Sequence, residues 1–183
     1  MAMWLSLYRK IQYRLRQTRQ QLGSVDALTP DDHAEVKHFL ASVTPDAQNL
    51  FYTMSLADQQ HSLRVCRGLQ ERGCQDEEML RSALLHDVGK AEGRVPFWTR
   101  PAIVLGKLIA PRLLMQLAVA PDNAVFPSLP GWRRALSYSW WHADVGANLC
   151  ERAGLSERAV LYVRTHHQAH GPAAELPSVD DVS

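Results

Sequence analysis

Residues 76–90 read DEEMLRSALLHDVGK, a helical pattern that ends in a histidine and an aspartate. Acids at the start and apolar residues from Met79 to Leu84 at intervals of three and four predict a helix with one apolar face. The run ends in His86-Asp87, and Gly89 is the expected terminator of the helix. The segment therefore predicts a helix that brings an imidazole and a carboxylate together at its end.

Helical patterns continue on both sides of this segment. Thr29-Pro30 and Thr44-Pro45 each place a capping residue before a proline and an acid, which is typical of a helix start. No segment alternates between apolar and polar residues with a period of two, so strands are not expected and the predicted fold class is all-α. Predicted helices follow both capping sites and cover residues 58–73, 76–86, 132–152 and 156–167.

Two other segments are open to more than one interpretation. Residues 4–22 combine an apolar stripe with basic residues and no acid, which predicts a basic amphipathic helix. We expect it to pack on its own domain, the alternatives being an anionic membrane surface or a nucleic acid. Residues 102–119 are strongly apolar but interrupted by Lys107, Pro111 and Arg112, which predicts two short helices that close over the core or touch a bilayer interface. Residues 121–130 are expected to form a loop.

Composition limits the class of protein. A chain of 183 residues with 46% hydrophobic and 21% charged residues fits one globular domain. The net charge of +1 gives no bulk attraction for nucleic acid, so no specific nucleic-acid partner is expected. The three cysteines show no C-x-x-C spacing, and basic residues interrupt any N-terminal apolar stretch. We therefore expect reduced thiols in a cytoplasmic protein, with a membrane-peripheral location as the alternative.

Histidines and aspartates occur where the predicted helices begin or end. A single histidine on an apolar helix is more often a core residue than a ligand, but a set of them beside carboxylates favours a metal site. We expect their side chains to converge on one pocket. The residues concerned are His61, His86, Asp87, His142, His166 and His167.

The motifs around these residues resemble the HD superfamily of metal-dependent phosphohydrolases. They are H-S-L-R-V from His61, L-L-H-D-V-G-K at 84–90, H-A-D-V-G-A from His142 and T-H-H ending at His167. The later histidines are similar to those of bacterial diadenosine-tetraphosphate hydrolases and HD-GYP cyclic-dinucleotide phosphodiesterases. The resemblance implies a compact helical HD-domain bundle over residues 50–183, with residues 1–49 as an N-terminal extension that packs on the core.

The resemblance also implies a role for each residue. One metal ion would be held by His61, His86, Asp87 and Asp180, with Asp181 as the alternative to Asp180. A second ion would share Asp87 and bind His142 and His166, with His167 near the substrate or serving as a further ligand. Catalysis is expected to depend on His86, Asp87 and Lys90. Lys90 and Arg64 would reach a bound phosphate, although Arg64 fits a solvated helix face equally well.

The activity implied is metal-dependent hydrolysis of a phosphoester or phosphoanhydride, with a nucleotide or dinucleotide as the small-molecule substrate. One or two divalent ions are expected, iron, manganese or another transition metal, because these suit mixed imidazole and carboxylate ligands. The sequence Q-A-H-G-P after His167 lacks the G-Y-P element, which argues against cyclic di-GMP, and Ala57 argues against a third metal. The alternative is a degenerate HD domain that binds or senses a nucleotide without turnover.

Overall fold

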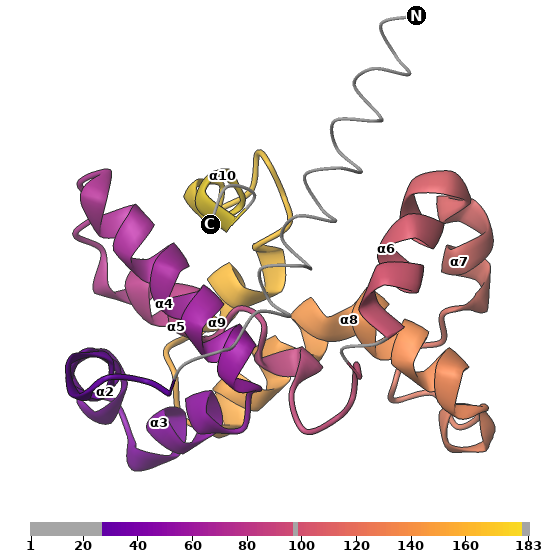
Figure 1. The fold of residues 1–183 in the computed structure, drawn as a ribbon, viewed down its shortest axis with the longest axis horizontal. Coiled ribbons are helices and arrows are strands. Elements are labelled where there is room, and N and C mark those ends of the chain that lie inside the picture. The colour runs from indigo at the N-terminus through magenta and orange to yellow at the C-terminus, as the bar shows by residue number, and fades with distance from the viewer. Residues whose placement is uncertain (1–26, 97–98, 181–183) are drawn as a thin grey trace, which may run out of the picture.

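The computed structural model describes residues 27–96 and 99–180, which form an all-α fold without a strand (Figure 1). The predicted fold class is therefore confirmed. The elements in chain order are α2 (Pro30–Val36), η1 (Lys37–Ala41), α3 (Pro45–Tyr52), α4 (Leu56–Glu71), α5 (Glu77–Leu85), η2 (Val88–Lys90), α6 (Arg100–Ile109), α7 (Pro111–Leu117), η4 (Phe126–Ser128), α8 (Gly131–Arg152), α9 (Glu157–Thr165) and α10 (Glu175–Asp180).

Local capping sets the helix starts where the sequence predicts them. Thr29 and Asp32 form a reciprocal capping box at α2, and the Thr44 hydroxyl accepts a hydrogen bond from the backbone N–H of Ala47 at α3. Ser156 caps α9 in the same way. At the other end, Gly73 follows α4 with a φ of 86°, a conformation that glycine adopts without strain.

One helix begins earlier than predicted, and two candidate residues lie inside helices. Helix α4 begins at Leu56, because Ser55 rather than Asp58 is its N-cap, so His61 lies inside the helix. His142 likewise lies in the middle of the long helix α8. The expectation that every candidate residue stands at a helix start or end is therefore wrong for these two. It holds for His86 and His166, which are the C-cap residues of α5 and α9.

The main core surrounds α5, which packs against α4, α9 and η1 (Figure 1). Leu84 and Leu85 of α5 are completely buried. Leu40 of η1 and Phe51 of α3 belong to the same apolar cluster, so the described residues before Leu50 share their core with the rest of the bundle. This packing fixes the C-terminal end of α5, where His86 and Asp87 follow.

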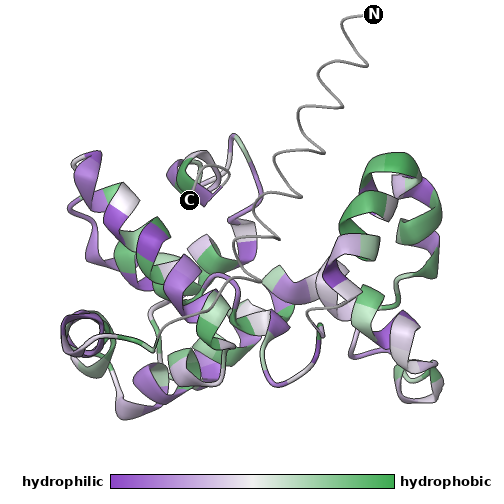
Figure 2. Ribbon diagram, viewed as in Figure 1, coloured by the Kyte–Doolittle hydropathy of each residue, from purple (hydrophilic) through white to green (hydrophobic). Residues whose placement is uncertain are grey.

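Helices α6 and α7 form a pair that packs on α8 at a distance from the main core (Figure 1). A small separate cluster of Val95, Ile103 and Leu136 holds the pair in place. The predicted break near Pro111 is confirmed, while the predicted loop 121–130 contains the short helix η4. Figure 2 shows that α6 and α7 carry the most hydrophobic ribbon in this part of the molecule.

Among the described residues, no helix is both long and apolar enough to cross a membrane. The predicted amphipathic helix over residues 4–22 lies outside the described residues.

Candidate metal centre

Seven imidazole and carboxylate side chains from distant parts of the sequence meet beside the end of α5. Their potential ligand atoms form two groups, within each of which all these atoms lie within 4.8 Å of one another, and Asp87 lies between the groups. The first group comes from α4, α5 and α10, and the second from α8 and the end of α9. The groups are His61, His86 and Asp180, and His142, His166 and His167.

The first group is centred on the carboxylate of Asp180. Its Oδ1 lies 2.7 Å from Nε2 of His61 and 3.7 Å from Nε2 of His86. His86 is completely buried, and its Nε2 has no hydrogen-bond partner within the described residues. A buried polar atom without a partner is costly, so this nitrogen is available to a further ligand.

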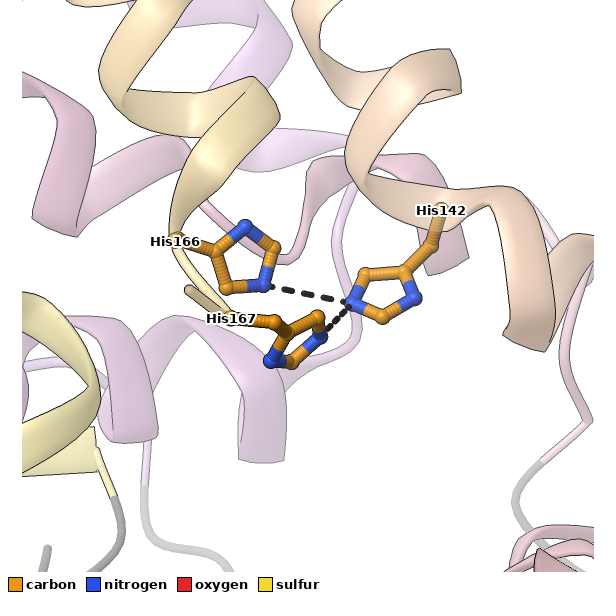
Figure 3. Close-up of side chains that lie close together, drawn as sticks. All are labelled: His142, His166 and His167. Carbon is orange, nitrogen blue, oxygen red and sulfur yellow. Dashed lines mark hydrogen bonds between the residues drawn. The ribbon is translucent and has the colours of Figure 1, made fainter. Parts of the chain in front are cut away.

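The second group consists of three imidazoles whose Nε2 atoms point at one another (Figure 3). Nε2 of His142 lies 3.3 Å from Nε2 of His166 and 2.9 Å from Nε2 of His167. His142 and His166 are buried, while His167 stands on the exposed rim. The group therefore opens toward solvent on the side of His167.

Asp87 connects the two groups. Its Oδ1 lies 3.7 Å from Nε2 of His86 and 3.5 Å from Nε2 of His142. The ammonium group of Lys90 lies 2.6 Å from the same oxygen. Burial opposes ionisation of this carboxyl, but the positive charge of Lys90 and the neighbouring histidines hold its pKa well below the ordinary value. Asp87 is thus a carboxylate, placed where it can bridge two cations.

Backbone carbonyls orient three of the imidazoles. Nδ1 of His86, His142 and His166 lies 2.8, 3.0 and 2.6 Å from the carbonyl oxygen three residues earlier in the chain. A carbonyl oxygen only accepts hydrogen bonds, so Nδ1 carries a proton and, in the neutral ring, Nε2 has a free lone pair. Histidine ligands of metals are typically held in this way by a partner on the opposite nitrogen.

The electrostatics favour a cation at both groups. Burial lowers the pKa of His142 well below its ordinary value, and burial with neighbouring charge lowers that of His166 to about 3 and of His167 to about 4. The lone pairs of His142 and His166 therefore face each other and repel unless a positive charge lies between them. At His86 burial acts in the same direction, but Asp87 and Asp180 raise its pKa to about 9, so the first group also favours positive charge.

The donor set has five imidazoles and two carboxylates. Such ligands suit iron, manganese, cobalt or zinc better than calcium or magnesium, which prefer oxygen. The side chains present therefore fit one or two divalent transition-metal ions.

Gly89 has a different role from the predicted one. Helix α5 already ends at Leu85, and the φ of Gly89 is not in the left-handed region, so this glycine does not terminate the helix. Instead η2 packs directly on α8, where a Cβ atom on Gly89 would lie 2.1 Å from the carbonyl oxygen of His142. Gly146 of α8 faces Gly89 across the same contact. Only glycine allows the approach that places Asp87 beside His142.

The remaining predicted site residues lie at or near the edge of the cluster. Lys90 is partly exposed and joined to Asp87, so it borders the site from the solvent side. Arg64 is exposed on α4, and no ion pair or hydrogen bond between described residues joins it to the cluster. Asp180 lies in the first group, whereas its alternative, Asp181, lies outside the described residues.

Asp58 and Arg100 form an ion pair that was not predicted from the sequence. Two nitrogens of the Arg100 guanidinium donate to the two oxygens of Asp58, at 2.6 and 2.7 Å. The pair links the start of α6 to α4, one helical turn before His61. Because 42 residues separate the partners, local sequence patterns give no indication of the contact.

Comparison of the chain with protein-family models, curated proteins and solved structures gave no match. The residues of the site, their geometry and the resemblance of their motifs are therefore the basis for assigning a function.

Proposed function

We propose that this protein is a metal-dependent phosphohydrolase that acts on a phosphoester or phosphoanhydride of a nucleotide or dinucleotide. The observation that carries the proposal is the pair of ligand groups joined by Oδ1 of Asp87, in a buried site. His61, His86 and Asp180 would hold one divalent ion, and His142 and His166 would hold the other, with Asp87 available to both. Beside His142, Nε2 of His167 is close enough to complete the second set.

Bound divalent metals supply Lewis-acid chemistry and lower the pKa of coordinated water toward neutrality. The side chains of the chain itself supply positioning. The carbonyl bonds to Nδ1 of His86, His142 and His166 fix the orientation of each imidazole and direct its Nε2 into the site. Asp87, held by Lys90, keeps its charge at the centre.

The charge of the loaded site favours an anionic substrate. Two divalent ions, two carboxylates and the ammonium group of Lys90 leave a net charge of about +3 when the imidazoles are neutral. Lys90 is partly exposed, so the same group that holds Asp87 can donate to a phosphoryl oxygen arriving from solvent. A phosphate ester matches this charge and this geometry.

The test is hydrolysis by the full chain, purified anaerobically and loaded with Fe²⁺, Mn²⁺, Co²⁺ or Ni²⁺. The substrates are a generic phosphodiester, nucleoside mono- and triphosphates, dinucleoside polyphosphates and cyclic dinucleotides. We expect metal-dependent turnover of at least one of them, and a loss of about 1,000-fold or more in His86→Ala and Asp87→Ala. His38→Ala, which changes an exposed histidine outside the cluster, is the matched control and keeps full activity.

Two results contradict the proposal. Turnover that survives both Asp87→Ala and His86→Ala would assign the activity to other residues. Tight nucleotide binding by a protein that stays inert with all four metals would assign the site to binding or sensing without turnover.

A further inference from the structure

Helix α6 has an unusual distribution of polar and apolar side chains. Val104, Leu105 and Ile109 are 41%, 46% and 72% exposed. Its two basic residues instead bind the protein: Arg100 pairs with Asp58, and the ammonium group of Lys107 donates to the carbonyl oxygen of Ser139 at 2.9 Å. Surface helices normally show the opposite arrangement, with apolar residues toward the core.

Helix α7 also carries exposed apolar side chains. Leu113 and Met115 are 56% and 55% exposed, and no residue of α7 is fully buried. The two helices nevertheless form a closely packed pair, because Leu114 packs so tightly on Gly106 that an added Cβ there would lie 2.8 Å from it. We call the exposed side chains Val104, Leu105, Ile109, Leu113 and Met115 the α6–α7 face.

The exposed charged residues of α7 and of the first turn of α8 are basic. Residues 93–143 contain six lysines and arginines and a single acid, Asp122, although the whole chain has a net charge of only +1. Arg112 at the start of α7 and Arg134 near the start of α8 are exposed. Trp132, a residue type that favours membrane interfaces, is also exposed, at 57%, in the first turn of α8.

We propose that the α6–α7 face binds to the surface of an anionic lipid bilayer. The exposed apolar side chains of the two helices provide the area that enters the headgroup region, and the exposed Arg112 and Arg134 match anionic headgroups. A ten-residue helix is about 15 Å long, half the thickness of the hydrocarbon layer, so the pair lies in the interface. A second copy of the chain would instead bring like charges together at this face.

The test is co-sedimentation of the full-length protein with phosphatidylcholine vesicles prepared with and without phosphatidylglycerol. We expect binding that requires phosphatidylglycerol and weakens with salt. The double variant Leu105→Glu/Ile109→Glu should lower the partition coefficient at least tenfold, because it places two carboxylates in the binding face. Arg112→Gln should lower it about fivefold. Leu161→Glu changes a leucine of α9 that is 41% exposed and serves as the matched control.

The outcomes separate this proposal from its competitors. Equal binding by wild type and the double variant would assign membrane contact to another segment, residues 4–22 being the first to test. Absence of vesicle binding, with a dimer in sedimentation velocity that the double variant dissociates, would assign the face to a second copy. Circular dichroism checks that each variant is folded. Hydrolysis of a soluble substrate should be unchanged in the double variant, so this test stands apart from that of the phosphohydrolase.

Discussion

Replacing Gly89 with alanine should damage the metal centre without touching any ligand. Gly89 lies in η2, two residues after Asp87, where the backbone contacts that of α8 at His142. The added methyl group has no side chain to displace, since its neighbours are backbone atoms of α8. The two elements therefore have to move apart.

The size of the movement follows from the distances. The added Cβ would lie 2.1 Å from the carbonyl oxygen of His142 and 2.9 Å from the nitrogen of Gly146, whereas Cβ atoms almost never approach other atoms closer than 3.0 Å. The backbones of η2 and α8 must then separate by about 1 Å, with an overpacking cost of about 1–3 kcal/mol. Asp87 moves relative to His142 by a similar distance, and a misplacement of about 1 Å at a reacting centre lowers turnover by about 100-fold.

Three glycine variants give a graded series. Gly131→Ala places its Cβ in open space and is the control, and Gly146→Ala meets the nitrogen of Gly89 at 3.3 Å and should be intermediate. Urea unfolding, metal content and turnover are measured for each variant. A Gly89→Ala protein that matches Gly131→Ala in metal content and turnover would refute the proposed role of this contact.

Three further predictions concern stability and reactivity. Asp58→Asn leaves the partly buried guanidinium of Arg100 without its carboxylate and should lower the free energy of unfolding by about 1–3 kcal/mol. Glu92→Gln, which breaks the more exposed ion pair of Glu92 with Arg94, should lower it by less than about 1 kcal/mol. Burial raises the pKa of Cys66 and Cys150 to about 12. At pH 8, Ellman's reagent should therefore modify only the partly exposed Cys74 in the folded protein. Modification of all three thiols under these conditions would contradict the burial of Cys66 and Cys150. Mn²⁺ at 100 times its dissociation constant should stabilise the protein by about 2.7 kcal/mol per site, and a chelator should abolish this effect. A melting temperature that does not depend on the metal would contradict this prediction.

Helix ends were predictable because the interactions that set them are local. Thr29, Thr44 and Ser156 each bond to a backbone N–H within three residues, and Gly73 ends α4 through its own backbone conformation. These interactions involve neighbours in the sequence. Residue type and spacing were therefore sufficient to predict them.

The contacts that assemble the site were not predictable in this way. The close approach of Gly89 to His142 and the pairing of Asp58 with Arg100 join elements far apart in the sequence. Helix α10, which carries Asp180, has only six residues and was not predicted as a helix. Its buried Leu176 and its packing against α4 hold it in place.

The identity of the candidate site residues could be predicted from the sequence more completely than their arrangement in space. Chemistry and motif resemblance selected all seven imidazoles and carboxylates that the structure brings together. The motif resemblance already implies a division into two groups that share Asp87, whereas the position of His167, with its Nε2 2.9 Å from that of His142, required coordinates. The same holds for the carbonyl partners of Nδ1, because the i−3 bond depends on the side-chain rotamer as well as the sequence position.

The most direct test of the metal centre is the number of ions bound per chain, measured by titration with Mn²⁺ and elemental analysis of the full-length protein. We expect two ions for the wild type and for His38→Ala, and the loss of at least one ion in His61→Ala and in His142→Ala. A wild-type protein that binds no transition metal, or variants that bind as many ions as the wild type, would contradict this expectation.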